Sequence, residues 1–84
     1  MVSPNDVTGK DRELIKVLYE GQGWSVAEVK WQGREAVGIR WDGEKEEDIG
    51  FPNARGNPVW FVVPDDLADL IRSVAKVYAR LKDN

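Results

Sequence analysis

The chain has 84 residues, of which 12 are Lys or Arg and 15 are Asp or Glu, so its formal net charge is −3. It contains neither cysteine nor histidine, which excludes disulfides and thiol chemistry and removes the commonest general base and metal ligand. The acidic balance disfavours a broadly basic nucleic-acid footprint. We therefore expect no catalytic residues, no metal site and no cofactor, and we predict that the protein is not an enzyme.

The length fits one small domain spanning residues 1–84, and a chain of this size buries only about 60% of its unfolded surface. The first residues lack the basic start and apolar core of a secretory signal. The longest apolar run, Val59–Val63, is too short to cross a bilayer. The sequence thus predicts a soluble cytoplasmic protein that does not associate with membranes.

The N-terminal quarter predicts an arm followed by a helix. Residues 1–7 are mostly polar and include a proline, which is typical of a loose arm. In segment 11–20 the apolar side chains recur at the spacing of one helical face, and Gly21 is a typical helix stop. These apolar positions are Leu14, Ile15, Leu18 and Tyr19.

Two β-rich runs, 24–31 and 35–41, surround a glycine turn and predict a hairpin. A two-residue loop at Gln32-Gly33 would place Glu28 and Lys30 among the apolar side chains, whereas a three-residue loop sorts polar from apolar side chains. Because a one-residue slip exchanges the faces, we predict the sorted register. Its apolar face holds Ala27, Val29, Trp31, Val37, Ile39 and Trp41, and its polar face holds Val26, Glu28, Lys30, Ala36, Gly38 and Arg40.

A long loop, 42–58, follows the hairpin. Connections of this length are usually functional or mobile. Acidic residues alternate in its first half as in a calcium-binding loop, but Glu47 occupies the position that requires glycine and Asn53 the position that requires glutamate. The first half is therefore predicted to be a solvated acidic loop.

The C-terminal third gives the strongest structural signal. Val59–Val63 has no polar alternation, which predicts a strand buried on both faces. Pro64 ends the strand, and Asp65 favours the start of a helix. The helix carries one apolar stripe, which we predict to be core: Leu67, Leu70, Ile71, Val74, Val77, Tyr78 and Leu81. The expected fold is α+β, in the order α-β-β-β-α, with a three-stranded, mainly antiparallel sheet flanked by two helices.

One pattern resembles a group of short, uncharacterised bacterial proteins. It runs through Arg40-Trp41-Asp42-Gly43, Gly50-Phe51-Pro52 and Arg55-Gly56-Asn57-Pro58-Val59-Trp60-Phe61, ending at Pro64. The similarity covers less than a third of the chain. Because that group has no assigned activity, the resemblance implies no function and no functional residue.

The surface of the sheet suggests a function in binding. Two helices can cover one face of an apolar sheet, so the other face would remain open unless a partner or a second copy buries it. We therefore predict a non-enzymatic binding module that forms a homodimer or binds another protein. An open alternative is that Gly38 only makes room for a helix or for Trp60. The candidate partner-binding residues are Trp24, Lys30, Arg34, Gly38, Arg40, Arg55 and Trp60.

The alternative function is binding of single-stranded nucleic acid. Aromatic and arginine side chains on a sheet can stack on bases, and Trp24, Trp60 and Arg40 are the candidates here. The net charge disfavours this alternative.

Overall fold

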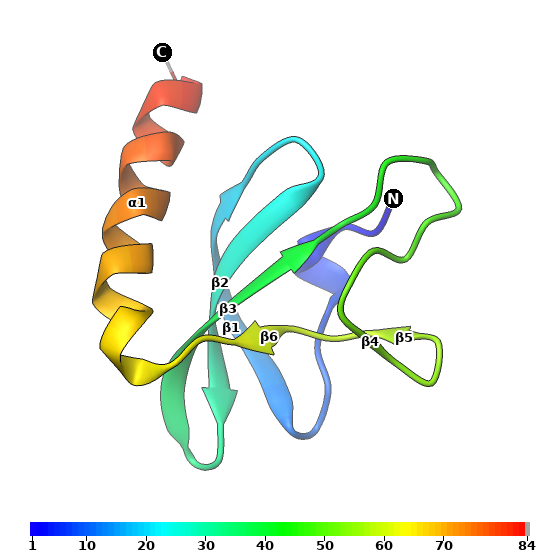
Figure 1. The fold of residues 1–84 in the computed structure, drawn as a ribbon, viewed down its shortest axis with the longest axis horizontal. Coiled ribbons are helices and arrows are strands. Elements are labelled where there is room, and N and C mark those ends of the chain that lie inside the picture. Colours follow the sequence, from blue (N-terminus) through cyan, green and yellow to red (C-terminus); the bar gives the residue numbers. More distant parts are fainter. Residues whose placement is uncertain (84) are drawn as a thin grey trace.

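A computed structural model describes residues 1–83, and its centre is a four-stranded antiparallel sheet in the order β1-β2-β3-β6 (Figure 1). The α+β class and the antiparallel sheet are confirmed, but the sheet has four strands where the sequence predicts three. The elements are η1 (Pro4–Asp6), β1 (Arg12–Glu20), β2 (Trp24–Trp31), β3 (Arg34–Trp41), β4 (Asn53–Ala54), β5 (Asn57–Pro58), β6 (Phe61–Val62) and α1 (Asp65–Asp83).

The predicted first helix is wrong, because segment 11–20 forms strand β1. Near the N-terminus, helical structure in the described residues is limited to the 3-10 turn η1. β1 pairs with β2 along its whole length, with register shifts between Leu14 and Lys16 and between Val17 and Tyr19. A bulge inserts one extra residue and resets the two-residue alternation of side chains. Two such shifts interrupt that alternation, so the apolar residues of β1 recur at spacings that imitate a helical stripe.

The predicted hairpin register is also wrong. Trp31 lies opposite Arg34, so the β2–β3 loop has two residues, Gln32 and Gly33. Both have positive φ, 52° and 77°, which is the geometry of the tight turn that matches the twist of the flanking strands. Sorting polar from apolar residues was a poor guide because neither face of this hairpin is free: the chain packs side chains against both.

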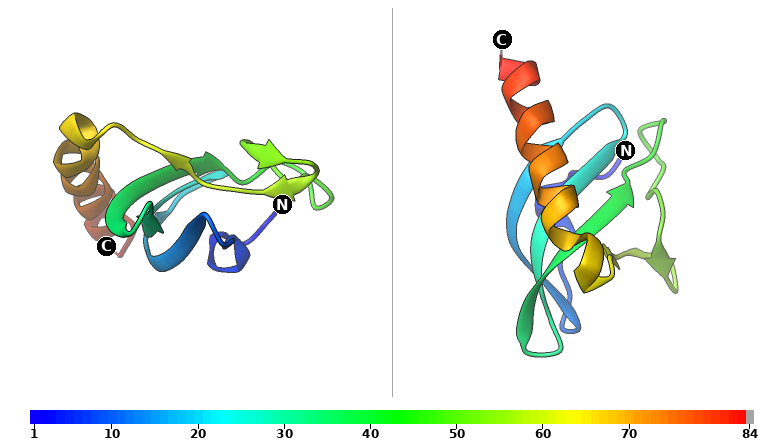
Figure 2. Two further views of the ribbon diagram at one scale, coloured as in Figure 1. Left: turned by 90° about the horizontal axis from the view of Figure 1, so that it is seen from below. Right: turned by 60° about the vertical axis from the view of Figure 1, so that its left-hand side comes forward.

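The two faces of the sheet carry separate cores. Figure 2 shows that α1 and the N-terminal segment lie on different sides of the sheet. On the arm face, the N-terminal segment and Trp60 cover the strands. The predicted loose arm is therefore packed, with Pro4 and Val7 buried and the Val2 amide donating to the Asp42 carbonyl. On the helix face, α1 covers part of the sheet. The arm-face core is Val7, Ala27, Val29, Ala36 and Trp60, and the helix-face core is Val26, Val37, Val63, Ala68 and Ala75.

Helix α1 forms where the sequence predicts it, but a different side of it contacts the sheet. Its buried residues are Ala68 and Ala75, whose small side chains let the helix approach the strands closely. Arg72 then anchors the helix through two hydrogen bonds, of 2.7 and 2.8 Å, to the Glu28 carboxylate on β2. Most of the stripe that the sequence assigns to the core is exposed: Leu67, Leu70, Val74, Val77, Tyr78 and Leu81.

Candidate functional site

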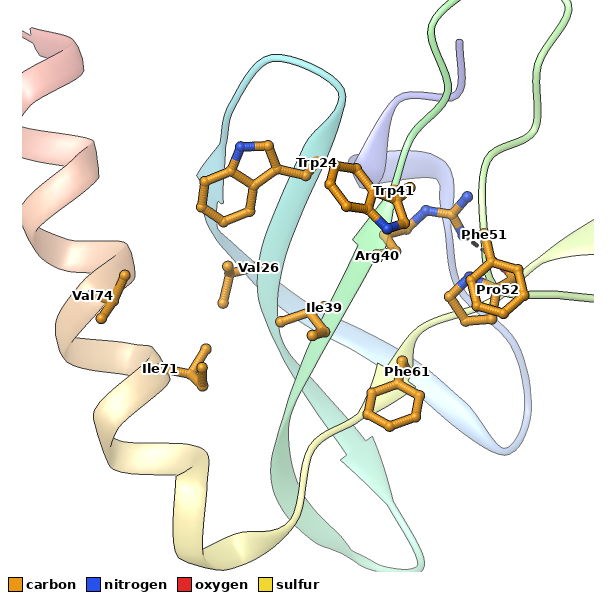
Figure 3. A pocket seen from close by; sticks show the side chains of 10 residues that line it. All are labelled: Trp24, Val26, Ile39, Arg40, Trp41, Phe51, Pro52, Phe61, Ile71 and Val74. Carbon is orange, nitrogen blue, oxygen red and sulfur yellow. Dashed lines mark hydrogen bonds between the residues drawn. The ribbon is translucent and has the colours of Figure 1, made fainter.

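An apolar groove of about 350 Å³ opens on the helix face between α1 and the far end of β3 (Figure 3). Its aromatic walls are unusually open to solvent, because Trp41 is 63% exposed, Phe51 62% and Phe61 51%. Large aromatic side chains normally lie in cores or at interfaces. The lining residues are Trp24, Val26, Ile39, Arg40, Trp41, Phe51, Pro52, Phe61, Ile71 and Val74.

The alternation of side chains along the strands brings the floor and one wall together. Trp24 lies opposite Trp41, and Val26 lies opposite Ile39. Ile39 in turn pairs with Phe61 on β6. Directly paired residues point to the same face of an antiparallel sheet, so all five side chains project on the helix face. β6 has only two residues and forms the edge of the sheet. No further strand of the described chain therefore lies beside Phe61 to cover its ring.

The loop wall of the groove is held by Arg40. This arginine is only 3% exposed, and its Nε donates to Asp42 Oδ1 at 3.1 Å. Its guanidinium also donates to the backbone carbonyls of Val59 at 2.8 Å, Pro52 at 3.4 Å, and Ile49. Burial lowers the pKa of Arg40, and the adjacent Asp42 carboxylate opposes that shift. One buried cation thereby fastens two points of the long loop, and Val59 directly after it, to the end of β3.

The same loop is tied to Trp41 through its backbone. The Trp41 amide donates to the Phe51 carbonyl at 2.7 Å, and the Phe51 amide donates back to the Trp41 carbonyl at 2.9 Å. At Gly50, where φ is +72°, a Cβ atom would lie 1.9 Å from the Trp41 carbonyl oxygen, so this close approach requires glycine. The exposed Trp41 and Phe51 are consequently fixed beside each other at the groove.

The exposed stripe of α1 continues the apolar surface away from the groove. Val74 lines the groove and also borders a shallow hollow along the helix with Val77, Tyr78 and Leu81. We call the groove and this stripe together the apolar face. Its exposed members are Trp41, Phe51, Phe61, Leu67, Leu70, Val74, Val77, Tyr78 and Leu81.

No protein-family model, curated protein or solved structure matches this chain. The resemblance to short bacterial proteins stays a prediction.

The seven residues predicted to bind a partner do not form one site. Trp24 and Arg40 line the groove, and Trp24 packs against Tyr19 and Tyr78 with ring centroids 5.0 and 5.9 Å apart. Gly38 and Trp60 are enclosed in the arm-face core. A Cβ atom on Gly38 would lie 2.9 Å from Trp60 Cβ, so Gly38 makes room for Trp60, as the alternative interpretation holds.

The other three predicted residues are exposed cations outside the groove lining. Arg34 pairs with Asp65 at 2.6 Å and lies over the Trp31 ring, 5.1 Å from its centroid. Lys30 and Arg55 are exposed, on β2 and in the β4–β5 turn respectively. These positions give no reason to group the three cations into one binding site.

Sequence reasoning missed the residues that dominate the apolar face. The sequence places Trp41 on the apolar face of the hairpin and Phe61 in a strand buried on both faces, whereas both side chains are exposed. A usable signal existed in α1, where the apolar positions keep a strict alternation of three and four residues, as in a helix that packs along another helix. This spacing does not show whether the surface that α1 packs against belongs to the same chain or to another one.

The described residues contain no group of three Asp, Glu, His or Cys side chains placed to hold a metal ion. Among the helices described, none is long and apolar enough to cross a membrane.

Asp48 organises the start of the long loop and gives a pH-dependent prediction. Its Oδ2 accepts hydrogen bonds from the backbone amides of Lys45 at 2.9 Å and Glu44 at 3.1 Å, and these bonds lower the pKa of Asp48. A lowered folded-state pKa means that the stabilisation is present above the unfolded pKa, near 3.9, and is lost as the pH falls through the folded value. A carboxyl NMR titration should give a pKa for Asp48 below the ordinary value of an aspartate. A normal or raised value would contradict this loop geometry.

Proposed function

We propose that this protein is a non-enzymatic interaction module of the cytoplasm, which binds another polypeptide through its apolar face. The observation that carries the proposal is that the exposed aromatic walls of the groove and the exposed stripe of α1 form one continuous surface, joined at Val74. Large contiguous apolar patches on a small domain mark interaction sites.

The composition of the apolar face supports a binding role over a chemical one. Arg40 is the one ionisable residue among the groove-lining residues, and its charge is already engaged by Asp42 and by backbone carbonyls. Aromatic residues at the centre of a face with few charges are characteristic of protein interfaces. The stripe also extends along a 19-residue helix, which is longer than a small ligand would need.

No observation favours the alternative function, single-stranded nucleic-acid binding. Base stacking would need Trp60 and Arg40 to reach a bound strand, and both side chains are enclosed by their own chain. Of the three, Trp24 alone leaves an aromatic ring at the groove.

The proposal is tested with an apolar fluorescent dye of the anilinonaphthalene type, added to dilute protein. We expect the dye to bind the native protein, and Phe61→Ser to reduce dye emission several-fold while the circular dichroism spectrum is unchanged. The matched control is Ile15→Ser, which removes an exposed apolar residue from β1, outside the groove lining. Equal dye emission from both variants, or no dye binding by the native protein at any dilution, would contradict the proposal.

A further inference from the structure

The exposed stripe of α1 has the spacing of a helix-pairing seam. Five exposed residues follow steps of three, four, three and four, so they occupy the two apolar positions of successive heptads. If this stripe packed on the sheet of its own chain, its side chains would be largely shielded from solvent. Leu70, however, is 61% exposed and Leu81 63%. The seam consists of Leu67, Leu70, Val74, Val77 and Leu81.

The chain exposes more surface than a folded monomer of its mass usually does. Its accessible area is 5898 Å², whereas a folded monomer of 9.5 kDa should expose about 5,050 Å². The excess, roughly 850 Å², is close to the ~800 Å² that each partner contributes to a standard stable interface. One partner of similar size would therefore bring the chain to the usual burial.

The charges on α1 indicate how a second α1 would lie. The first turn is acidic, with Asp65 and Asp66, and the last turn is basic, with Arg80 and Lys82. Asp66 and Arg80 directly precede Leu67 and Leu81 at the two ends of the seam. Parallel pairing would bring like charges together at both ends, whereas antiparallel pairing brings each acidic end to a basic end and also opposes the helix dipoles.

We propose that the apolar face is occupied by a second copy of this chain, with the two α1 helices packed antiparallel along their seams about a twofold axis near Val74. This inference rests on the proposed function and names its partner. The contact is isologous, so each copy both offers and receives the same surface. Asp66 of one copy faces Arg80 of the partner subunit, and the partner helix closes the open side of the groove that Val74 joins to the seam.

Analytical ultracentrifugation of the full chain tests the pairing. We expect a reversible dimer of about 19 kDa, twice the mass of the chain. Leu70→Glu should weaken dimerisation about 100-fold or more, because it places a carboxylate in the seam of both copies. Position 70 is exposed in the single chain, so this variant should keep its fold, as checked by circular dichroism. The control is Lys76→Glu, an exposed position on another side of α1, which should dimerise like the native protein.

Single-cysteine variants test the orientation cleanly, because the native chain has no cysteine. Under mild oxidation Val74→Cys should form a disulfide-linked dimer, since the two copies of position 74 meet near the twofold axis. Leu67→Cys should not, because antiparallel pairing separates the two copies of position 67 by ~20 Å along the helix axis. Cross-linking of Leu67→Cys as readily as Val74→Cys would overturn the antiparallel arrangement.

The outcomes separate this inference from the proposed function. A strict monomer at every concentration that nevertheless binds the apolar dye would overturn the second copy as occupant and retain the binding surface. A strict monomer that binds no dye would overturn both. A dimer that survives Leu70→Glu without loss of affinity would overturn the seam as its interface.

Discussion

Replacing Arg40 by alanine is expected to lower the free energy of unfolding by about 3–5 kcal/mol, because the substitution leaves a buried charge without its partner. Asp42 is 2% exposed, and its carboxylate would keep only the hydrogen bond from Ser25 Oγ, at 2.5 Å, among its present side-chain partners. The Val59 carbonyl would also lose its donor. A domain of 84 residues has a total stability of roughly 4–12 kcal/mol, so this one change removes a large part of it.

Urea unfolding of the native protein and of Arg40→Ala, at the same protein concentration, measures this loss of stability. The control is Arg34→Ala, which breaks the exposed pair with Asp65 and should cost no more than ~1 kcal/mol. Equal losses for the two variants would contradict the assignment of Arg40 as a buried clamp. The double variant Arg40→Met with Asp42→Asn should lose less than Arg40→Ala alone, since it removes both charges together.

Arg40→Ala should also weaken ligand binding at the apolar face. Arg40 binds the carbonyls of Ile49 and Pro52, which flank Phe51 in the chain. Without these bonds the loop wall is held to β3 chiefly by the paired backbone bonds between Trp41 and Phe51. We expect dye binding to fall in Arg40→Ala even under conditions in which the variant is still folded.

Sequence patterns located the C-terminal helix because all of its signals are local. Pro64, the acidic first turn and the basic last turn lie in the helix or directly beside it. The strand β1 was misread for the opposite reason. Its bulges are set by pairing with β2, and nothing within segment 11–20 distinguishes a twice-bulged strand from an amphipathic helix.

The sequence predicted an incompletely covered apolar surface, but it did not predict which residues form that surface. Periodicity shows that one side of α1 is apolar, yet it does not show what covers that side. The chain uses Ala68 and Ala75 for the contact with its own sheet, because small residues allow a close approach. The larger apolar residues of α1, such as Leu70, remain exposed to solvent. The predicted open sheet face is therefore wrong, because the N-terminal segment and Trp60 cover the arm face and α1 covers part of the other face. The exposed apolar side chains lie instead along α1 and around the groove.

Trp60→Ala is expected to have an effect as large as that of Arg40→Ala. Trp60 is fully buried at the centre of the arm face, and truncating a buried tryptophan to alanine typically costs about 3–5 kcal/mol. The substitution also removes the hydrogen bond, 2.7 Å long, that the indole Nε1 donates to the Val7 carbonyl, and leaving a buried acceptor unsatisfied adds ~1 kcal/mol or more. The combined loss approaches the whole stability of a domain this small.

Two further substitutions make this result interpretable when urea unfolding is followed in the Leu70→Glu background, where dimerisation does not contribute. Trp41→Ala deletes the same side chain from a position that is 63% exposed and should change stability by no more than about 0.5 kcal/mol. Trp60→Phe keeps an aromatic ring in the core but removes the N–H donor, so its loss should fall between those of the two alanine variants. If Trp60→Ala and Trp41→Ala unfolded at the same urea concentration, Trp60 could not be the side chain that closes the arm face over Gly38.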